Sequence, residues 1–315
     1  MLTPKYLTVQ ELLDEQAERL KLTLLGGKNG LNRKISCPRI QKPGLALTGY
    51  FTQLRSERVQ ILGNTEWSFL QTLTVERRQE VLTSICKMSI SCFVLTKNLL
   101  PPPELIKLGN KYKIPILQSI LQSSVFIRQI STYMEEKLAP ETSIHGVLMD
   151  IYGRGVLLLG KSSIGKSECA LDLIVRGHRL VSDDMVNIKL ISPDVLIGSG
   201  PELIRYHMEL RGLGIINIKD LFGVAAVRYR KKIELAVMME EWKEEFEYDR
   251  LGLEESKITI LGIDLPLIKM PVAPGRNMAI IIEVAARNQL LKESGYYSAR
   301  DFDEKVIGRL KKRPP

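Results

Sequence analysis

One eight-residue loop constrains the fold of this chain more than any other segment, because it separates an apolar run from an amphipathic one. The apolar run, residues 155–159, predicts a buried strand, and residues 167–176 predict a helix that Gly177 ends. A strand, a glycine loop and a helix in this order are the context in which a phosphate-loop motif becomes a site. The loop fits the pattern G-x-x-x-x-G-K-[ST] and consists of Gly160, Lys161, Ser162, Ser163, Ile164, Gly165, Lys166 and Ser167.

The chemistry of this loop predicts a binding site for a nucleoside triphosphate. Backbone N–H groups of such a loop point at a polyphosphate, and the dipole of the following helix favours its negative charge. In this pattern Lys166 reaches the β- and γ-phosphates, and Ser167 offers its hydroxyl to Mg²⁺. A nucleoside triphosphate and Mg²⁺ are therefore the expected ligand and cofactor.

Charge and cysteine content exclude several classes of protein. The formal net charge is +9, from 45 Lys and Arg against 36 Asp and Glu, and suits an anionic partner. Part of the excess lies in a basic helix expected over residues 302–312. The sequence has no basic motif interleaved with aromatic residues, so a nucleic-acid partner is not expected. The four cysteines lack C-x-x-C spacing, so neither zinc nor disulfides are expected. Without a signal-peptide pattern or a membrane-length apolar run, we expect a cytoplasmic protein with no membrane partner.

The length of 315 residues predicts two domains. The first part opens with a capping box from Thr8 to Glu11 and a helix to about Leu20, and then alternates short strands with helices. This alternation predicts an α/β fold, with a smaller α/β domain over residues 1–134 and a catalytic domain over residues 135–315. The role of the first domain stays open between structure, regulation and assembly. Strands of the second domain are expected at residues 146–151, 156–159, 179–182, 186–191, 225–227, 233–236, 259–260 and 279–284.

Two adjacent carboxylates follow the strand expected at residues 179–182. Asp183 and Asp184 are placed to hold Mg²⁺ or to take a proton from an attacking hydroxyl, whereas a helix cap or a turn would need only one of them. His145 precedes another expected strand, where pattern alone favours a structural hydrogen bond over catalysis. Two glycine-bearing segments, 209–217 and 271–277, fit an ordinary turn as readily as a site.

Taken together, these segments resemble the HPr kinase/phosphorylase family, bifunctional bacterial enzymes that act on a serine of the phosphocarrier HPr. The resemblance is specific over roughly residues 140–290 and looser before them. Six motifs occur in the order of the family: IHGV at 144–147, GKSSIGKSE at 160–168, RGHRLVSDD at 176–184, ELRGLGIIN at 209–217, YDRLG at 248–252 and PGRN at 274–277.

The resemblance implies a phosphate-loop kinase domain similar to phosphoenolpyruvate carboxykinase, a homohexamer, and HPr as the partner. It implies that ATP phosphorylates the serine and that inorganic phosphate removes the group as pyrophosphate. The positions that match the catalytic residues of the family are His145, Lys166, Asp184 and Arg250, and those that match its Mg²⁺ ligands are Ser167 and Glu209. The segment that matches one used in both reactions comprises Met208, Glu209, Leu210, Arg211, Gly212, Leu213, Gly214, Ile215, Ile216 and Asn217. The segment that matches one used in dephosphorylation comprises Pro271, Val272, Ala273, Pro274, Gly275 and Arg276.

Two positions depart from the pattern of the family. Ser163 stands where a second glycine is usual, and a side chain there strains the loop if φ is positive. Ala273 stands where arginine is usual, which puts the efficiency of the phosphorylase direction in question. Two other functions remain open at this point: a small-molecule kinase with the same loop, and a nucleotide-sensing regulator without turnover.

Overall fold

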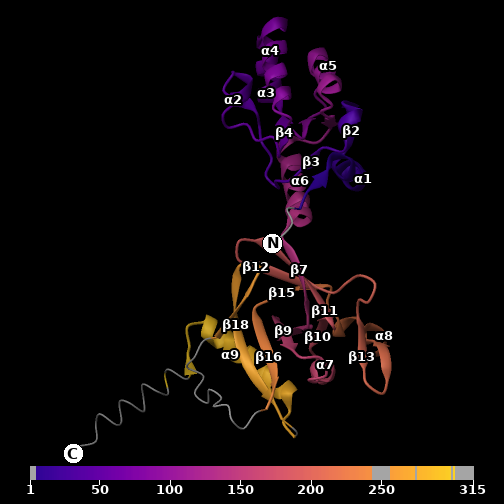
Figure 1. The fold of residues 1–315 in the computed structure, drawn as a ribbon, viewed down its shortest axis with the longest axis vertical. Helices are drawn as coiled ribbons and strands as arrows, with labels where there is room; N and C mark the ends of the chain where they lie inside the picture. The colour runs from indigo at the N-terminus through magenta and orange to yellow at the C-terminus, as the bar shows by residue number, and fades with distance from the viewer. Residues whose placement is uncertain (1–4, 243–255, 274, 299–300, 302–315) are drawn as a thin grey trace, which may run out of the picture. The chain divides into compact units, whose positions relative to one another are not determined.

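The computed structural model describes residues 5–242, 256–273, 275–298 and 301, and the chain divides into two compact units, Met1–Ala139 and Pro140–Pro315 (Figure 1). The mixed α/β fold expected from the sequence is confirmed in both units. Within the described residues no helix is long and apolar enough to span a membrane.

The first unit is built on a four-stranded sheet with the strand order β2-β6-β5-β4. Its strands are β2 (Leu22–Gly26), β4 (Val59–Leu62), β5 (Cys92–Leu95) and β6 (Ile116–Ser119). The three strands β4, β5 and β6 are parallel, and β2 pairs with β6 in the antiparallel direction. A short antiparallel pair, β1 (Leu7–Thr8) with β3 (Lys34–Ile35), lies outside this sheet.

Helices cover both faces of this sheet. Side chains alternate along each strand, so one buried strand contributes to a core cluster on each face. Phe93 and Leu95 of β5 belong to one core cluster and Cys92 and Val94 to the other. The first cluster includes residues of α2 (Gly44–Leu47), α3 (Asn64–Thr72), α4 (Val75–Lys87) and α5 (Pro103–Tyr112). The second includes residues of α1 (Val9–Leu20) and α6 (Ser123–Leu138).

The capping box predicted at the start of the chain is confirmed at α1. The Thr8 hydroxyl accepts a hydrogen bond from the Glu11 backbone N–H at 3.1 Å, and the Glu11 carboxylate accepts one from the Thr8 N–H at 2.7 Å. The two bonds satisfy two groups that a helix N-terminus otherwise leaves unpaired.

The second unit consists of helices, a central sheet and a second sheet. The central sheet has the strand order β10-β8-β9-β16-β18-β17, in which β9, β16 and β18 are parallel to one another. Its strands are β8 (Val147–Ile151), β9 (Arg154–Gly160), β10 (Arg179–Ser182), β16 (Leu235–Glu241), β17 (Ser256–Ile260) and β18 (Ile263–Val272). The second sheet has the order β15-β12-β11-β7, with β7 (Glu141–His145), β11 (Met185–Ser192), β12 (Val195–Ser199) and β15 (Arg230–Lys232).

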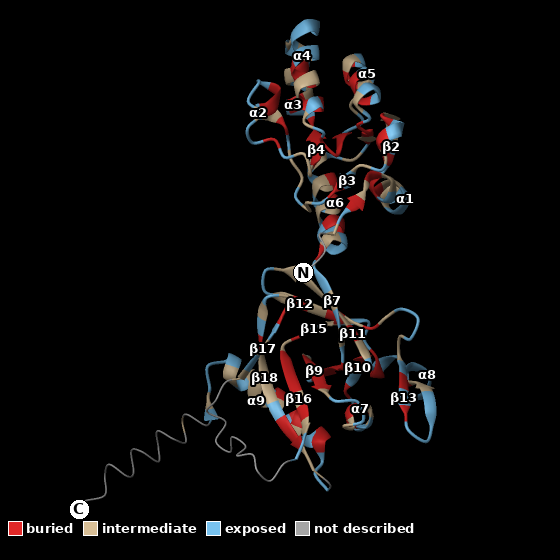
Figure 2. Ribbon diagram, viewed as in Figure 1, coloured by how far each residue is buried: buried red, intermediate tan, exposed pale blue. Residues whose placement is uncertain are grey.

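The two faces of β9 explain how these layers are held together. Val156 and Leu158 pack in one cluster with α7 (Lys166–Val175) and α9 (Met278–Glu293). Leu157 and Leu159 pack in another cluster with residues of the second sheet. All four side chains are buried, so β9 is the middle of the core (Figure 2). The remaining elements are the hairpin β13 (His207–Leu210) and β14 (Gly214–Asn217), followed by α8 (Ile218–Phe222) and the short 3₁₀ helix η2 (Val224–Ala226).

Two of the expected strands are wrong. Residues 225–227 fall mainly in η2, and residues 279–284 lie in α9. The buried residues Ala279, Ile282 and Ala286 of α9 follow helical spacing, and the Asn277 side chain accepts a hydrogen bond from the Ile280 N–H at 3.1 Å and so starts the helix. The short apolar run at residues 278–282 fits the period of a helix and that of a strand, so periodicity alone does not distinguish the two there. The helix expected at residues 302–312 lies outside the described residues.

Candidate functional site

The glycine loop, residues 160–167, joins the end of β9 to the start of α7, as the sequence predicts. Gly160 has a φ of 143°, and a Cβ there would lie 2.5 Å from the Met239 carbonyl oxygen of β16, so the close approach of two strands requires glycine. Gly165 has a φ of 95° and precedes α7 without a side-chain cap. The first N–H groups of α7 are therefore free of a capping side chain at the loop.

Lys166 places its charge inside the glycine loop. The residue is buried, and its Nζ donates hydrogen bonds to the carbonyl oxygens of Gly160 and Lys161, both at 2.9 Å. A buried ammonium group held by carbonyl dipoles next to a helix N-terminus forms a concentrated positive field. That field suits a phosphate lodged in the loop.

Ser167 and Asp183 form a hydroxyl–carboxylate pair at the start of α7. The Ser167 Oγ donates to the Asp183 Oδ1 at 2.9 Å, and Asp183 is buried after the end of β10. Burial raises the pKa of the Asp183 carboxyl above its ordinary value, although hydrogen bonds from Ser167 and from the backbone of Glu209 and Asp184 oppose this. Sequence reasoning identified the aspartate pair but did not assign Asp183 to Ser167, because the contact joins the start of α7 to the residue after β10 and depends on how these elements pack.

His145 and Asp184 lie next to each other at the ends of two paired strands. The His145 Nδ1 is 3.2 Å from the Asp184 Oδ1, and both side chains are at least half exposed. The register of β7 with β11 brings His145 opposite Met185, and the Gly146 N–H donates to the Asp184 carbonyl at 2.9 Å. Asp184 has a φ of 66°, a conformation that costs free energy for a residue with a Cβ. The sheet therefore holds Asp184 in this turn, with its carboxylate in water.

The segment 208–217 forms the β13–β14 hairpin rather than an irregular loop. Met208 and Leu210 anchor the hairpin in the core around α7, while Glu209 and Arg211 are exposed. The Arg211 guanidinium donates a hydrogen bond to the Ser163 hydroxyl and so connects the hairpin with the glycine loop. Two glycines, at 212 and 214, have φ of 83° and 88° and allow the tight turn.

Ser163 itself has a φ of 74°, which is the condition under which a side chain strains this loop. Its contact with Arg211 offsets part of that cost, since a charge-assisted hydrogen bond stabilises the loop in the observed conformation.

The segment 271–276 begins at the carboxyl end of β18, on the same side of the sheet as the glycine loop after β9. In the parallel register Met239 pairs with Gly160 on one side and with Met270 on the other, and Glu240 pairs with Pro271. The Arg276 guanidinium donates to the Pro271 carbonyl oxygen at 3.1 Å, which closes the turn after β18. Ala273 and Gly275 belong to this turn, whereas Pro274 lies outside the described residues. The predicted catalytic residue Arg250 and its motif at 248–252 also lie outside them.

Hard oxygen donors at the site fit Mg²⁺ better than a transition metal. The donor pair is the Ser167 hydroxyl and the Asp183 carboxylate. In the described part of the chain no three His, Cys, Asp or Glu side chains gather into a metal cage. Magnesium is typically held by one or two protein oxygens together with substrate phosphates and waters, so this sparse donor set fits it.

The sequence matches known families and proteins along nearly all of its length. Residues 7–134 match the family "HPr Serine kinase N terminus", and residues 136–306 match "HPr Serine kinase C-terminal domain". The HPr kinase/phosphorylase of Geobacter sulfurreducens is 52% identical over 308 residues, covering 98% of this chain and 97% of that protein. The one of Brevibacillus brevis is 46% identical over 288 residues, covering 91% and 93%. The solved Hpr(Ser) kinase/phosphatase from Coxiella burnetii is 37% identical, spans 51% of this chain and 98% of its own, and superposes with a TM-score of 0.47.

Proposed function

Because the chain belongs to the HPr serine kinase family, we propose that it transfers the γ-phosphoryl group of ATP to a serine of an HPr-type phosphocarrier. We propose equally that it removes that group by phosphorolysis, which releases pyrophosphate. The observation that carries the proposal is a set of three contacts within one unit, made by residues that are neighbours in the chain: Lys166 inside the glycine loop, Ser167 on Asp183, and His145 on Asp184. Phosphate binding, metal binding and proton transfer thus have adjacent groups.

In this proposal the glycine loop is a phosphate loop and the second unit a kinase domain of the phosphoenolpyruvate-carboxykinase type. The first N–H groups of α7 and the Lys166 ammonium bind the β- and γ-phosphates. Ser167 and Asp183, with Glu209 of the hairpin, hold Mg²⁺. Bound Mg²⁺ supplies neutralisation of the charge that develops on the phosphoryl group.

In the forward direction Asp184 accepts the proton of the target serine while the serine oxygen forms a bond to the γ-phosphorus and the bond to ADP breaks. The exposed carboxylate of Asp184 can meet a side chain delivered by a separate protein, which a buried carboxylate could not. His145, 3.2 Å away, orients this carboxylate. Arg250 adds a further positive charge in the role that the resemblance implies.

In the reverse direction inorganic phosphate occupies the glycine loop and attacks the phosphorus of phosphoserine. The P–O bond to serine breaks, pyrophosphate forms, and Asp184 returns its proton to the serine oxygen. The hairpin 208–217 supports both directions through the contact of Arg211 with Ser163, and the turn 271–276 supports the reverse one. We further propose that the enzyme is cytoplasmic. We also propose that it assembles as a homohexamer, and light scattering of the purified chain tests this oligomeric state.

The test is a mass measurement on the carrier. The purified chain is incubated with ATP, Mg²⁺ and an HPr-type carrier, excess phosphate is then added, and carrier mass and pyrophosphate are followed. A single phosphoryl addition that phosphate reverses, with pyrophosphate appearing, is the expected result. Addition without reversal limits the protein to the kinase reaction. Transfer to a small molecule instead, or ATP binding without any transfer, contradicts the proposal in favour of a metabolite kinase or of a regulator.

A further inference from the structure

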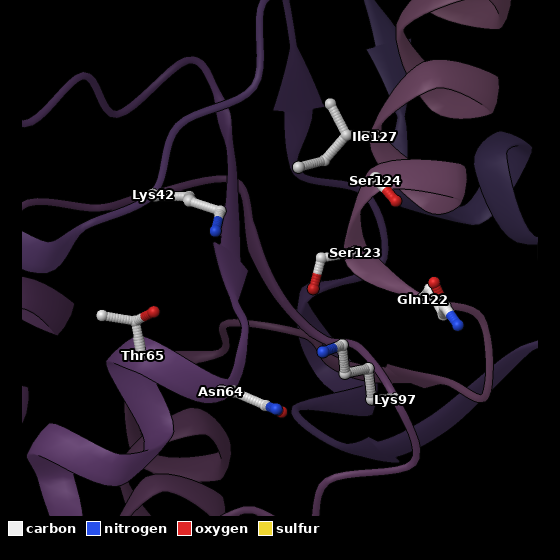
Figure 3. A pocket seen from close by; sticks show the side chains of 8 residues that line it. All are labelled: Lys42, Asn64, Thr65, Lys97, Gln122, Ser123, Ser124 and Ile127. Carbon is white, nitrogen blue, oxygen red and sulfur yellow. The ribbon is translucent and has the colours of Figure 1, made fainter.

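A pocket of about 370 Å³ opens in the first unit, which contains none of the motifs that the proposed function uses (Figure 3). Its lining comes from four separate chain segments, since it includes Lys42, residues 64–65, Lys97 and residues 122–124. The volume lies at the lower end of the range of small-molecule sites. We call it the lysine pocket.

The lysine pocket lies where the topology of the sheet favours a ligand. The chain enters it directly after β4, shortly after β5 and shortly after β6, the three parallel strands, so it is at their carboxyl ends. The helix after β5, α5, packs in one core cluster, and the helix after the adjacent β6, α6, packs in the other. Helices that leave neighbouring strands toward opposite faces open a crevice between the two loops, which is where open α/β sheets bind ligands.

Two cations and a hydroxyl converge on this crevice. The ammonium groups of Lys42 and Lys97 and the hydroxyl of Ser123 point toward the middle of the hollow (Figure 3). Lys42 lies 4.0 Å from the Glu66 carboxylate, which is buried and also accepts a hydrogen bond from the Gly63 N–H. Among the described residues Lys97 has no carboxylate within ion-pair distance. The pocket therefore keeps an excess of positive charge.

Backbone donors add to this charge. Both α3, with nine residues, and α6, with sixteen, begin at the pocket. At α3 the Glu66 carboxylate caps the Gly63 N–H, whereas no side chain caps α6. The first intrahelical bonds are made by the N–H groups of Trp67 and Phe126, so those of residues 64–66 and 123–125 have no partner within their helices. The uncapped N-terminus of α6 and two lysines around one hollow form a site for an anion with several acceptor oxygens.

The backbone around the lysine pocket is held in place at some cost. Lys97 and Asn98 have φ of 59° and 57°, and their N–H groups donate to the carbonyl oxygens of Leu121 and Ser119. At Gly63 a Cβ would lie 3.0 Å from the Ser123 hydroxyl and 3.7 Å from the Lys42 Nζ, so glycine keeps this space open. Strained turns and a glycine kept for space are typical of binding sites.

We propose that the lysine pocket binds a small phosphate-bearing metabolite. The phosphate lies between Lys42 and Lys97, on the N-terminus of α6, and the organic body occupies the rest of the pocket. This site is separate from the glycine loop and does not depend on the function proposed for it.

Lysine acetylation followed by mass spectrometry tests the site on the full chain. Glycerol 3-phosphate is the probe, glycerol the uncharged control, and Lys87, an exposed lysine at the end of α4, the internal reference. We expect the probe, but not glycerol, to slow acetylation of Lys42 and Lys97 without affecting Lys87. Unchanged rates at Lys42 and Lys97 up to about 10 mM probe, or equal slowing at Lys87, overturn the proposal.

Two variants sharpen the result. In Lys97→Met, protection of Lys42 should require roughly tenfold more probe, because one charge-assisted contact is lost, whereas the matched control Lys107→Met, at another exposed lysine, should behave as the parent protein. Lys42→Met should weaken protection of Lys97 in the same way. In Lys166→Met, protection of both lysines should persist, which separates this site from the glycine loop. Loss of protection in Lys166→Met overturns the assignment.

Discussion

The glycine loop and the lysine pocket are built at the same place in two different sheets, at the carboxyl ends of parallel strands. The anion site proposed for the glycine loop consists of eight consecutive residues, with one buried lysine and one helix N-terminus. The site proposed at the lysine pocket comes from four separate segments, with two exposed lysines and the uncapped N-terminus of α6. A contiguous site can bury its charge because the loop itself supplies carbonyl partners, as Gly160 and Lys161 do for Lys166. A dispersed site leaves its charges to solvent and depends on the fold to keep them together.

The largest expected effect is on phosphoryl transfer, which depends on the glycine loop and not on the lysine pocket. Lys166→Met removes the ammonium group from the glycine loop, so we expect phosphoryl transfer in both directions to fall by roughly 10³-fold or more, because charge on the transferring group is no longer neutralised. Lys161→Met, at an exposed position of the same loop, is the matched control and should lose far less. Initial rates of carrier phosphorylation and of pyrophosphate release measure it. Near-normal rates in Lys166→Met would contradict the assignment of the loop.

The next effect concerns the chemistry that the glycine-loop site has and the lysine pocket lacks. Asp184→Asn keeps the size of the side chain but not its basicity, so we expect kcat to fall by about 10²–10³-fold with little change in nucleotide affinity. His145→Asn should have a smaller effect, because in the proposed mechanism His145 orients Asp184 and does not act on the substrate. Full kinase activity in Asp184→Asn would exclude its role as the base.

A third prediction concerns how the stability of the second unit responds to acid. Glu283 of α9 is bonded to Arg176 and to His178, both at 2.7 Å, and so ties the end of α7 to α9. The hydrogen bond from Arg176, helped by the one with His178, lowers the pKa of Glu283 from 4.5 to about 2. Burial of the carboxyl group acts in the opposite direction. A lowered pKa stabilises the folded state above the unfolded value, so this contribution is complete above about pH 4.5 and is lost as the pH falls toward 2.

Glu283→Gln should therefore lower the free energy of unfolding by about 1.5–3 kcal/mol at neutral pH and by progressively less below pH 4.5. Urea unfolding of the full chain at several pH values measures this difference. Since the glutamate lies in the second unit, lysine-pocket protection at Lys97 should be the same in the variant at neutral pH. A loss of stability that does not depend on pH would show that Glu283 acts through packing alone.

The smallest effect concerns the strain in the glycine loop. Ser163→Gly relieves a positive φ but loses the hydroxyl that Arg211 contacts, so we expect the free energy of unfolding to rise by only about 0.5 kcal/mol. Ser162→Gly, at a position without positive φ, is the control and should not stabilise the protein. Urea midpoints at constant slope give the comparison, and a lower midpoint for Ser163→Gly than for Ser162→Gly would show that the Arg211 contact outweighs the strain.

The sequence by itself determined the features that depend on neighbouring residues. The order of β9, the glycine loop and α7, the capping box of α1 and the position of β10 follow from periodicity and from local hydrogen bonds, which the chain makes within a few residues. The same local motifs, taken in order, indicated the family.

Only the tertiary structure decided which groups meet across long stretches of sequence. The pairing of Ser167 with Asp183, the contact of Arg211 with Ser163 and the helical state of residues 279–284 depend on packing between elements. The lysine pocket is the extreme case, since the bridge of Gln41 with Gln60 places Lys42 beside β4, and the parallel pairing of β4 with β5 brings Lys97 to the same end of the sheet. The physical reason is that a hydrogen bond or a helical period acts over a few residues, whereas burial of an apolar face selects partners from the whole chain.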